Sequence, residues 1–200
     1  METSNHSLVY KAIGIQAVAF AVYIIFTGVY SGVPSINIFG GTVSIGAVIK
    51  MSNLGLLLSG LVLAFSGVML FRVGEKKVKV SGSLFIIGGV FAAIAAIIIL
   101  INNATQNVPA TFLLGLFLAS NTMAMPILGL SILRALKEED YVIKYSTALY
   151  IVTPIFTVYG LLGLALAGLV ATTLIYIESQ GLPEQAEKLT ETMEKVIPEQ

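Results

Sequence analysis

Asn121, Thr122 and Pro126 lie in the most polar stretch inside any long apolar segment of this sequence. Because proline has no amide hydrogen, Pro126 leaves the carbonyl of Thr122 without its helical partner. An unpaired amide such as that of Asn121 is also costly inside a membrane. These groups could coordinate an ion through a carbonyl, contact a quinone headgroup, or form a hydrogen bond between two helices. The hydrogen bond is the common role of a buried Asn in a membrane protein.

A second set of polar side chains recurs in the first apolar segment, where Gln16, Tyr23, Thr27 and Tyr30 follow one another at helical spacing. Residues spaced in this way share one helix face. The face is either a packing surface or one wall of a polar path between the first, fourth and fifth segments. The candidate polar intramembrane site therefore consists of Asn121, Thr122, Pro126, Gln16, Tyr23 and Thr27.

Acidic side chains, histidine and cysteine are missing from every long apolar segment, and the one histidine, His6, lies in the polar N-terminal stretch. Proton relays and most ion-coupling sites need intramembrane carboxylates or histidines. Zinc, thiolate and bis-histidine haem sites lack their ligands as well. Met123 and Met125 could bind Cu(I), but residues two apart do not share a helix face, which favours gap-filling. We predict no catalytic, cofactor-binding or metal-binding residues, and no enzyme.

The composition indicates where such a chain resides. Of its 200 residues, 56% are hydrophobic and only 11% are charged. Soluble domains carry about a quarter charged residues, and a soluble globule of this size still needs a polar surface. A lipid-facing surface accommodates the excess apolar side chains. The formal net charge of zero gives no reason to expect nucleic acid as a partner, and no phosphate-binding glycine motif indicates a nucleotide.

Five apolar segments reach the about 20 residues that a membrane-crossing helix needs. They are Ala12–Ser31, Met51–Phe71, Ser81–Ile101, Thr111–Leu133 and Ser146–Ile177. The fifth is longer than one perpendicular crossing but too short for two crossings with a turn. We therefore expect it to tilt, to kink near Pro154, or to project one end into water.

Lysine and arginine residues predict the orientation of these segments. Eight of the 11 cations fall before the first segment, between the second and third, or between the fourth and fifth. They are Lys11, Arg72, Lys76, Lys77, Lys79, Arg134, Lys137 and Lys144. The positive-inside rule then predicts a multi-pass cell-membrane protein with a cytoplasmic N-terminus and, after five crossings, an extracytoplasmic C-terminus.

The C-terminal residues differ in kind from the apolar segments, so the chain divides into a bundle over residues 1–180 and an acidic tail over 181–200. Pro183 suits the first turn of a short helix after Leu182. The predicted partner-docking face of this helix consists of Ala186, Leu189, Met193, Val196 and Ile197. An amphipathic helix this short is marginal alone, so it either docks on the outer loops or a partner subunit, or remains a solvated tail.

Small residues recur along the apolar segments and predict close helix packing. They include Gly60 and Gly67 in the second segment and Gly88, Ala92 and Ala96 in the third. The sequence thus predicts an all-α membrane protein: a bundle of about five transmembrane helices with a short amphipathic C-terminal helix.

The function predicted from these features is that of a non-catalytic integral membrane subunit or scaffold, for example in a respiratory or other energy-converting complex. Its support is the absence of coupling residues and the presence of an amphipathic tail. The alternative is a small oligomeric permease or channel for a small solute or ion, because uncoupled pores need no intramembrane charge. The expected partners are the lipid bilayer and other membrane subunits or further copies of the chain.

Overall fold

The protein is an all-α membrane bundle. The computed structural model describes residues 3–28, 37–38, 41–42, 45–102, 108–136 and 141–196, with side chains for 7–27, 52–102, 108–136 and 141–180. Within these ranges, five helical stretches are long and apolar enough to cross a membrane. They are Ser7–Thr27, Ser52–Phe71, Lys76–Asn102, Val108–Ala135 and Tyr141–Gln180. The predicted fold class is confirmed.

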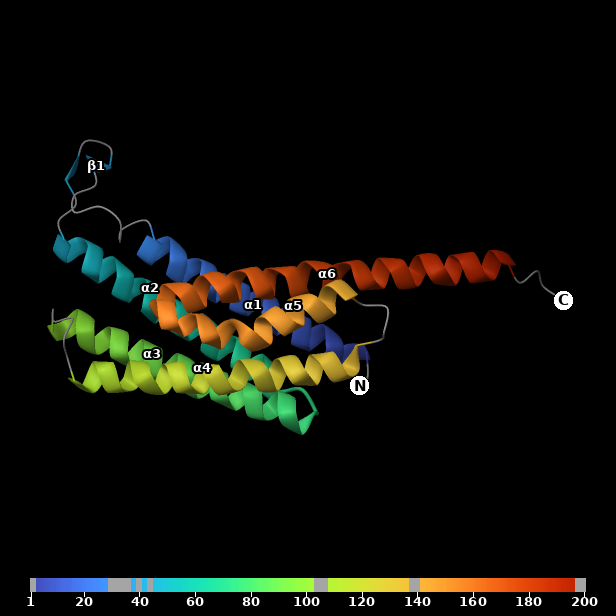
Figure 1. Cartoon of the computed structure of the whole chain (residues 1–200), viewed down its shortest axis with the longest axis horizontal. Helices are drawn as coiled ribbons and strands as arrows, with labels where there is room; N and C mark the ends of the chain where they lie inside the picture. Colours follow the sequence, from blue (N-terminus) through green and yellow to red (C-terminus); the bar gives the residue numbers. More distant parts are fainter. Residues whose placement is uncertain are drawn as a thin grey trace.

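The helices run up and down the long axis of the molecule (Figure 1). Their bounds are α1 Thr3–Gly28, α2 Ile45–Phe71, α3 Lys76–Asn102, α4 Val108–Ala135, α5 Tyr141–Val152 and α6 Gly160–Val196. A 3-10 helix, η1, covers Thr153–Tyr159 between α5 and α6. Two short antiparallel strands, β1 Asn37–Ile38 and β2 Gly41–Thr42, pair between α1 and α2.

The fifth apolar stretch is a helical hairpin, where the sequence predicted one over-long helix. Pro154 lies in η1, so the interruption expected near this residue is present. At Gly160 the backbone has φ 77°, a conformation that side chains with a Cβ disfavour, and α6 then runs back along α5. A Cβ on Gly163 would lie 2.6 Å from the carbonyl oxygen of Phe156, which shows how tightly the chain turns. The 3-10 geometry lengthens the first arm, so a stretch that seemed too short for two helical arms and a turn contains both.

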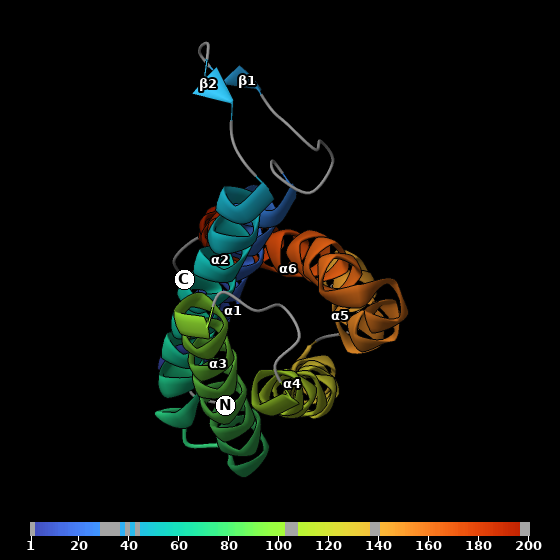
Figure 2. The same cartoon turned by 90° about the vertical axis from the view of Figure 1, so that its left-hand side faces the viewer.

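The six α-helices form a closed ring. Each packs against its neighbours in sequence, and α6 packs against α1, which completes the circle. Figure 2 shows this arrangement end-on, with α2 and α3 on one side and the α5–α6 hairpin on the other. Within the described residues, helices on opposite sides of the ring do not approach one another through their backbones. Side chains therefore fill the centre.

Glycine pairs bring α2 and α3 into direct backbone contact. A Cβ on Gly67 would lie 2.6 Å from the carbonyl oxygen of Gly82, and the same geometry recurs one heptad further along between Gly60 and Gly89. Gly88, which the sequence singled out, instead faces α4, where the amide nitrogen of Asn121 lies 3.0 Å from its would-be Cβ. Two faces of α3 thus contact two neighbours, each through glycine.

One end of the bundle carries most of the charge. Here α2 and α4 end, α3 and α5 begin, and the N-terminus lies (Figure 1). We call it the basic end. Its described cations are Lys11, Arg72, Lys76, Lys77, Lys79, Arg134 and Lys144. The Lys144 ammonium lies 5.7 Å from the centre of the Tyr141 ring, a cation–π contact suited to a membrane interface.

The C-terminal part of α6 extends past the other helices at this same end (Figure 1). Pro183 does not begin a separate helix, because α6 is helical from Gly160 through Val196. The predicted docking residues Ala186, Leu189, Met193 and Val196 lie in this extension, outside the described side chains, and Ile197 lies outside the described residues. Docking on the outer loops is at odds with this placement, since those loops join helices at the opposite end.

Candidate functional site

A small pocket lies where four helices of the ring face one another across its centre. Its volume is about 30 Å³. The lining residues are Ala19, Phe20 and Tyr23 from α1, Leu56, Ser59 and Leu63 from α2, Phe117 from α4, and Leu161, Leu164 and Ala165 from α6. Because α4 packs against neither α1, α2 nor α6 through its backbone, a pocket shared by all four lies on the axis of the ring.

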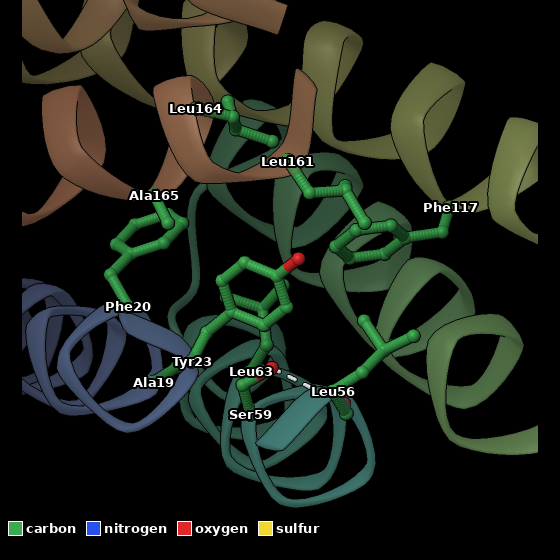
Figure 3. Close-up of a pocket in the computed structure, with 10 residues that line it drawn as sticks. All are labelled: Ala19, Phe20, Tyr23, Leu56, Ser59, Leu63, Phe117, Leu161, Leu164 and Ala165. Atoms are coloured by element: carbon green, nitrogen blue, oxygen red, sulfur yellow. Dashed lines mark hydrogen bonds between the residues drawn. The ribbon is translucent and has the colours of Figure 1, made fainter. Parts of the chain in front are cut away.

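Tyr23 supplies the polar group that points into this pocket. Figure 3 shows its ring in the middle of the lining residues, with the hydroxyl directed between Leu161 and Phe117. The Ser59 hydroxyl instead donates to the carbonyl oxygen of Leu56 on its own helix, at 3.2 Å. The pocket is therefore an apolar chamber with the Tyr23 hydroxyl in its wall.

Gln16 lies one turn nearer to the basic end than the pocket residues Ala19 and Phe20. Its side chain is fully buried, and its Oε1 accepts a hydrogen bond from the Tyr150 hydroxyl of α5 at 2.6 Å. This bond crosses the ring, since α1 and α5 are not neighbours. The amide nitrogen of Gln16 has no hydrogen-bond partner within the described part of the chain. One donor thus remains unpaired below the pocket.

Asn121 lies one turn below Phe117 on α4, on the same side of the pocket as Gln16. It is 1% exposed, and its Nδ2 donates to the carbonyl oxygen of Phe117 at 2.8 Å. Its Oδ1 finds no hydrogen-bond donor among the described residues. The Asn121 side chain lies against Gly88 of α3, and an unpaired buried acceptor costs about 1–3 kcal/mol, so this oxygen would gain from any donor that reached it.

The remaining predicted site residues differ in whether their polar atoms are paired. The Thr122 hydroxyl donates to the carbonyl oxygens of Leu118 at 2.9 Å and Ala119 at 2.8 Å, so its own helix satisfies it. Helix α4 runs unbroken through Pro126. The hydrogen bond between helices in this region comes from Ser81 of α3, which donates to the Ala124 carbonyl at 2.8 Å. Thr27 lies one turn beyond Tyr23, toward the opposite end, and its hydroxyl has no hydrogen-bond partner among the described residues.

Sequence reasoning missed two residues of the site, Tyr150 and Thr147. Both are fully buried on α5, and the Thr147 hydroxyl lacks a hydrogen-bond partner within the described residues. A tyrosine in the middle of an apolar segment needs a partner for its hydroxyl. That signal pointed to Tyr150. Because the fifth segment was interpreted as a single helix, the residue that pairs with the Tyr150 hydroxyl could not be identified.

The buried polar side chains of the described chain are all uncharged. Among the described residues, no three His, Cys, Asp or Glu side chains group as metal ligands would. Met125 is fully buried whereas Met123 is 58% exposed, so these two sulfurs lie on different faces of α4. The arrangement offers neutral hydrogen-bonding groups inside a membrane-embedded bundle.

Comparison of the chain with protein-family models, with curated proteins and with solved structures gives no match. The fold and the site define a multi-pass integral membrane protein with a polar centre. Its role is therefore argued from its own residues.

Proposed function

We propose that this protein is a small permease or channel whose path follows the axis of the helix ring. The observation that carries this proposal is the pair of buried amides, Gln16 and Asn121, which each keep an unpaired polar atom and each lie one helical turn from a residue that lines the axial pocket. Unpaired polar atoms are expensive in a membrane protein because no lipid group can satisfy them. A passing solute or water would satisfy both.

Reconstitution into liposomes tests the proposal. The purified protein is placed in vesicles, an osmotic gradient of a permeant solute is imposed, and light scattering follows the swelling. We expect swelling to be faster than in protein-free vesicles, and slower again with Gln16→Leu, because leucine removes the polar atoms from the path. Swelling that stays at the protein-free rate for ions and for neutral solutes alike contradicts the proposal.

A second candidate is the membrane subunit or scaffold, which the α6 extension favours. This part of α6 projects beyond the bundle, where no other described helix accompanies it (Figure 1). A short helix of this kind gains stability by packing on a partner. Extraction in mild detergent, pull-down and mass spectrometry would identify other subunits, and truncation after Gln180 should release them. Recovery of this chain alone contradicts the subunit function.

For the orientation, we propose that the basic end faces the cytoplasm, as the positive-inside rule requires. The α5–η1 arm is about 32 Å long, enough to cross a hydrocarbon layer of about 30 Å. The hairpin then supplies two crossings. The C-terminus returns to the cytoplasmic side, in place of the extracytoplasmic side that a single fifth crossing predicted.

The absence of cysteine makes this orientation simple to test. Single cysteines replace exposed Ser7 and Gln180 at the basic end, and exposed Val108 at the opposite end. A membrane-impermeant maleimide added to inside-out vesicles should label the first two and spare the third. Labelling of positions 7 and 180 from opposite sides would show that the fifth stretch crosses only once.

A further inference from the structure

The geometry points to a substrate that is small, uncharged and equipped with both a hydrogen-bond donor and a hydrogen-bond acceptor. This inference rests on the proposed permease function and names the substrate class for the same site. It follows from three features of the ring: which charges are absent from its centre, which polar atoms are unpaired there, and how much space the pocket offers.

The centre of the ring offers no counter-charge to an ionic solute. Every buried polar side chain in the described chain is neutral, and the cations whose side chains are described gather at the basic end. An ion that leaves water without a partner loses far more solvation free energy than a neutral molecule does. Channels that pass bare cations replace that hydration with rings of free backbone carbonyls. Here the helices are regular over the residues that line the pocket, so the carbonyls of those residues are engaged. Pro126 leaves one carbonyl free nearby, that of Thr122, which is a single group and not a ring.

The unpaired atom of Asn121 is a hydrogen-bond acceptor, so the solute must carry a donor. Its amide group must turn Nδ2 toward the Phe117 carbonyl, because a carbonyl oxygen can only accept. Its Oδ1 is therefore the unpaired atom, and only a molecule that donates a hydrogen bond can satisfy it. The assignment does not depend on resolving nitrogen from oxygen, since the Phe117 contact allows one orientation only.

Gln16 supplies the complementary group. With Oε1 paired to the Tyr150 hydroxyl, the amide nitrogen is left as a donor that needs an acceptor. Thr147, on the same helix as Tyr150, adds a hydroxyl that can both donate and accept. A molecule with one donor and one acceptor would pair with these groups in turn on its way through the ring.

The pocket limits the size of this molecule. A site needs about 10–15 Å³ of accessible space to hold one water, so the 30 Å³ pocket has room for about two. Molecules of a few non-hydrogen atoms fit this space, and larger ones require the helices to move. Water, urea and glycerol are members of the class, with the highest rate expected for the smallest.

The closing experiment compares solutes and matched variants in proteoliposomes of the full chain. Urea, glycerol and water are followed by light scattering, and potassium by a potential-sensitive dye. Asn121→Leu and Thr147→Val remove unpaired polar atoms at nearly constant size. Thr122→Val is the control, because its hydroxyl is already satisfied within α4. We expect neutral-solute flux to fall roughly tenfold with Asn121→Leu, as for the loss of one hydrogen bond, and to stay unchanged with Thr122→Val.

Each outcome decides the inference. Passage of the neutral solutes, or of water alone as the smallest member of the class, together with loss of flux in Asn121→Leu, supports it. If Asn121→Leu fails to fold, Thr147→Val takes its place. Passage of potassium but not of neutral solutes overturns the substrate class while the permease function stands. Equal slowing by Asn121→Leu and Thr122→Val also overturns the inference. No passage of any solute overturns the permease function itself.

Discussion

The α2–α3 pair and the centre of the ring solve the same packing problem in opposite ways. Between α2 and α3, two glycine pairs one heptad apart remove side chains altogether, and backbone meets backbone. Inside the ring, the backbones stay apart, and the side chains of Gln16 and Tyr150 join two helices that are not neighbours. The first region leaves no space for another molecule. The second leaves a pocket and unpaired polar atoms.

The difference shows where stability and function reside. Lipid chains are as apolar as leucine, so helices in a membrane associate through close packing, weak Cα–H···O contacts and hydrogen bonds, and glycine maximises the first two. The centre gives up part of this stabilisation, since each unpaired buried polar atom costs about 1–3 kcal/mol. We therefore expect changes between α2 and α3 to affect folding, and changes in the centre to affect solute passage first.

The largest effect is expected from Gly89→Leu. A Cβ at Gly89 would overlap the carbonyl oxygen of Gly60, and backbone cannot move aside as a side chain can. We expect loss of monodisperse protein in size-exclusion chromatography, because overpacking costs about 1–3 kcal/mol even where neighbours adjust. Gly115→Leu is the matched control, since no atom lies within 4 Å of its would-be Cβ. If the two variants elute equally, α2 and α3 do not pack through direct backbone contact at Gly89.

A smaller loss is expected from Gly160→Val at the hairpin turn. Its φ of 77° and ψ of −171° fall in a region that is essentially restricted to glycine, and other residues lose about 1–3 kcal/mol there. The variant should unfold at a lower temperature in detergent than Gly115→Ala. An unchanged midpoint would argue against the hairpin and in favour of a single fifth helix.

The hydrogen bond across the ring should show coupling of about 1 kcal/mol. Tyr150→Phe leaves the whole Gln16 amide unpaired, and Gln16→Leu leaves the Tyr150 hydroxyl unpaired, so each single variant should be less stable. The double variant removes both polar groups and should recover most of the loss. Thermal unfolding of all four proteins measures this coupling, and strictly additive shifts would mean that the bond does not form.

The smallest effect is expected from Ser81→Ala, which removes the hydrogen bond to the Ala124 carbonyl. Hydrogen bonds between membrane helices contribute about 0.6 kcal/mol on average. Ser83→Ala is its control, because that hydroxyl donates to Lys79 within α3. If both substitutions shift the unfolding midpoint equally, Ser81 does not join α3 to α4.

The fold was largely predictable because membrane burial imposes long apolar segments, and α2, α3 and α4 each include a predicted one. The hairpin was not, because its cause is local: a glycine with positive φ after a 3-10 stretch. In an apolar segment, Gly160 resembles the other small residues that serve helix packing. The length of the segment alone indicated one crossing. At the rise per residue of an α-helix, which is smaller than that of a 3-10 helix, the segment seemed too short for two crossings.

Part of the site was predictable from residue type. Gln16, Tyr23 and Asn121 are polar residues inside apolar segments, and the structure places all three in or just below the pocket. Thr122 belongs to the same polar stretch, yet its hydroxyl bonds back to its own helix. Periodicity cannot distinguish Asn121 from Thr122, because it shows which residues are polar but not whether every polar atom of a side chain finds a partner. Tyr150 required knowledge of the hairpin.

The α5–η1–α6 hairpin also has a consequence for how the chain is made. Its first arm contains Lys144, Pro154 and a 3-10 stretch, which makes it a poor candidate for stable insertion alone. Under the two crossings proposed above, the long apolar start of α6 follows directly in the chain and can insert together with this arm. Until α5 and α6 are in place, Gln16 lacks its hydrogen-bond partner Tyr150, and α1 lacks its contact with α6. The contact between α1 and α6, which closes the ring, therefore forms only after α6 has been synthesised.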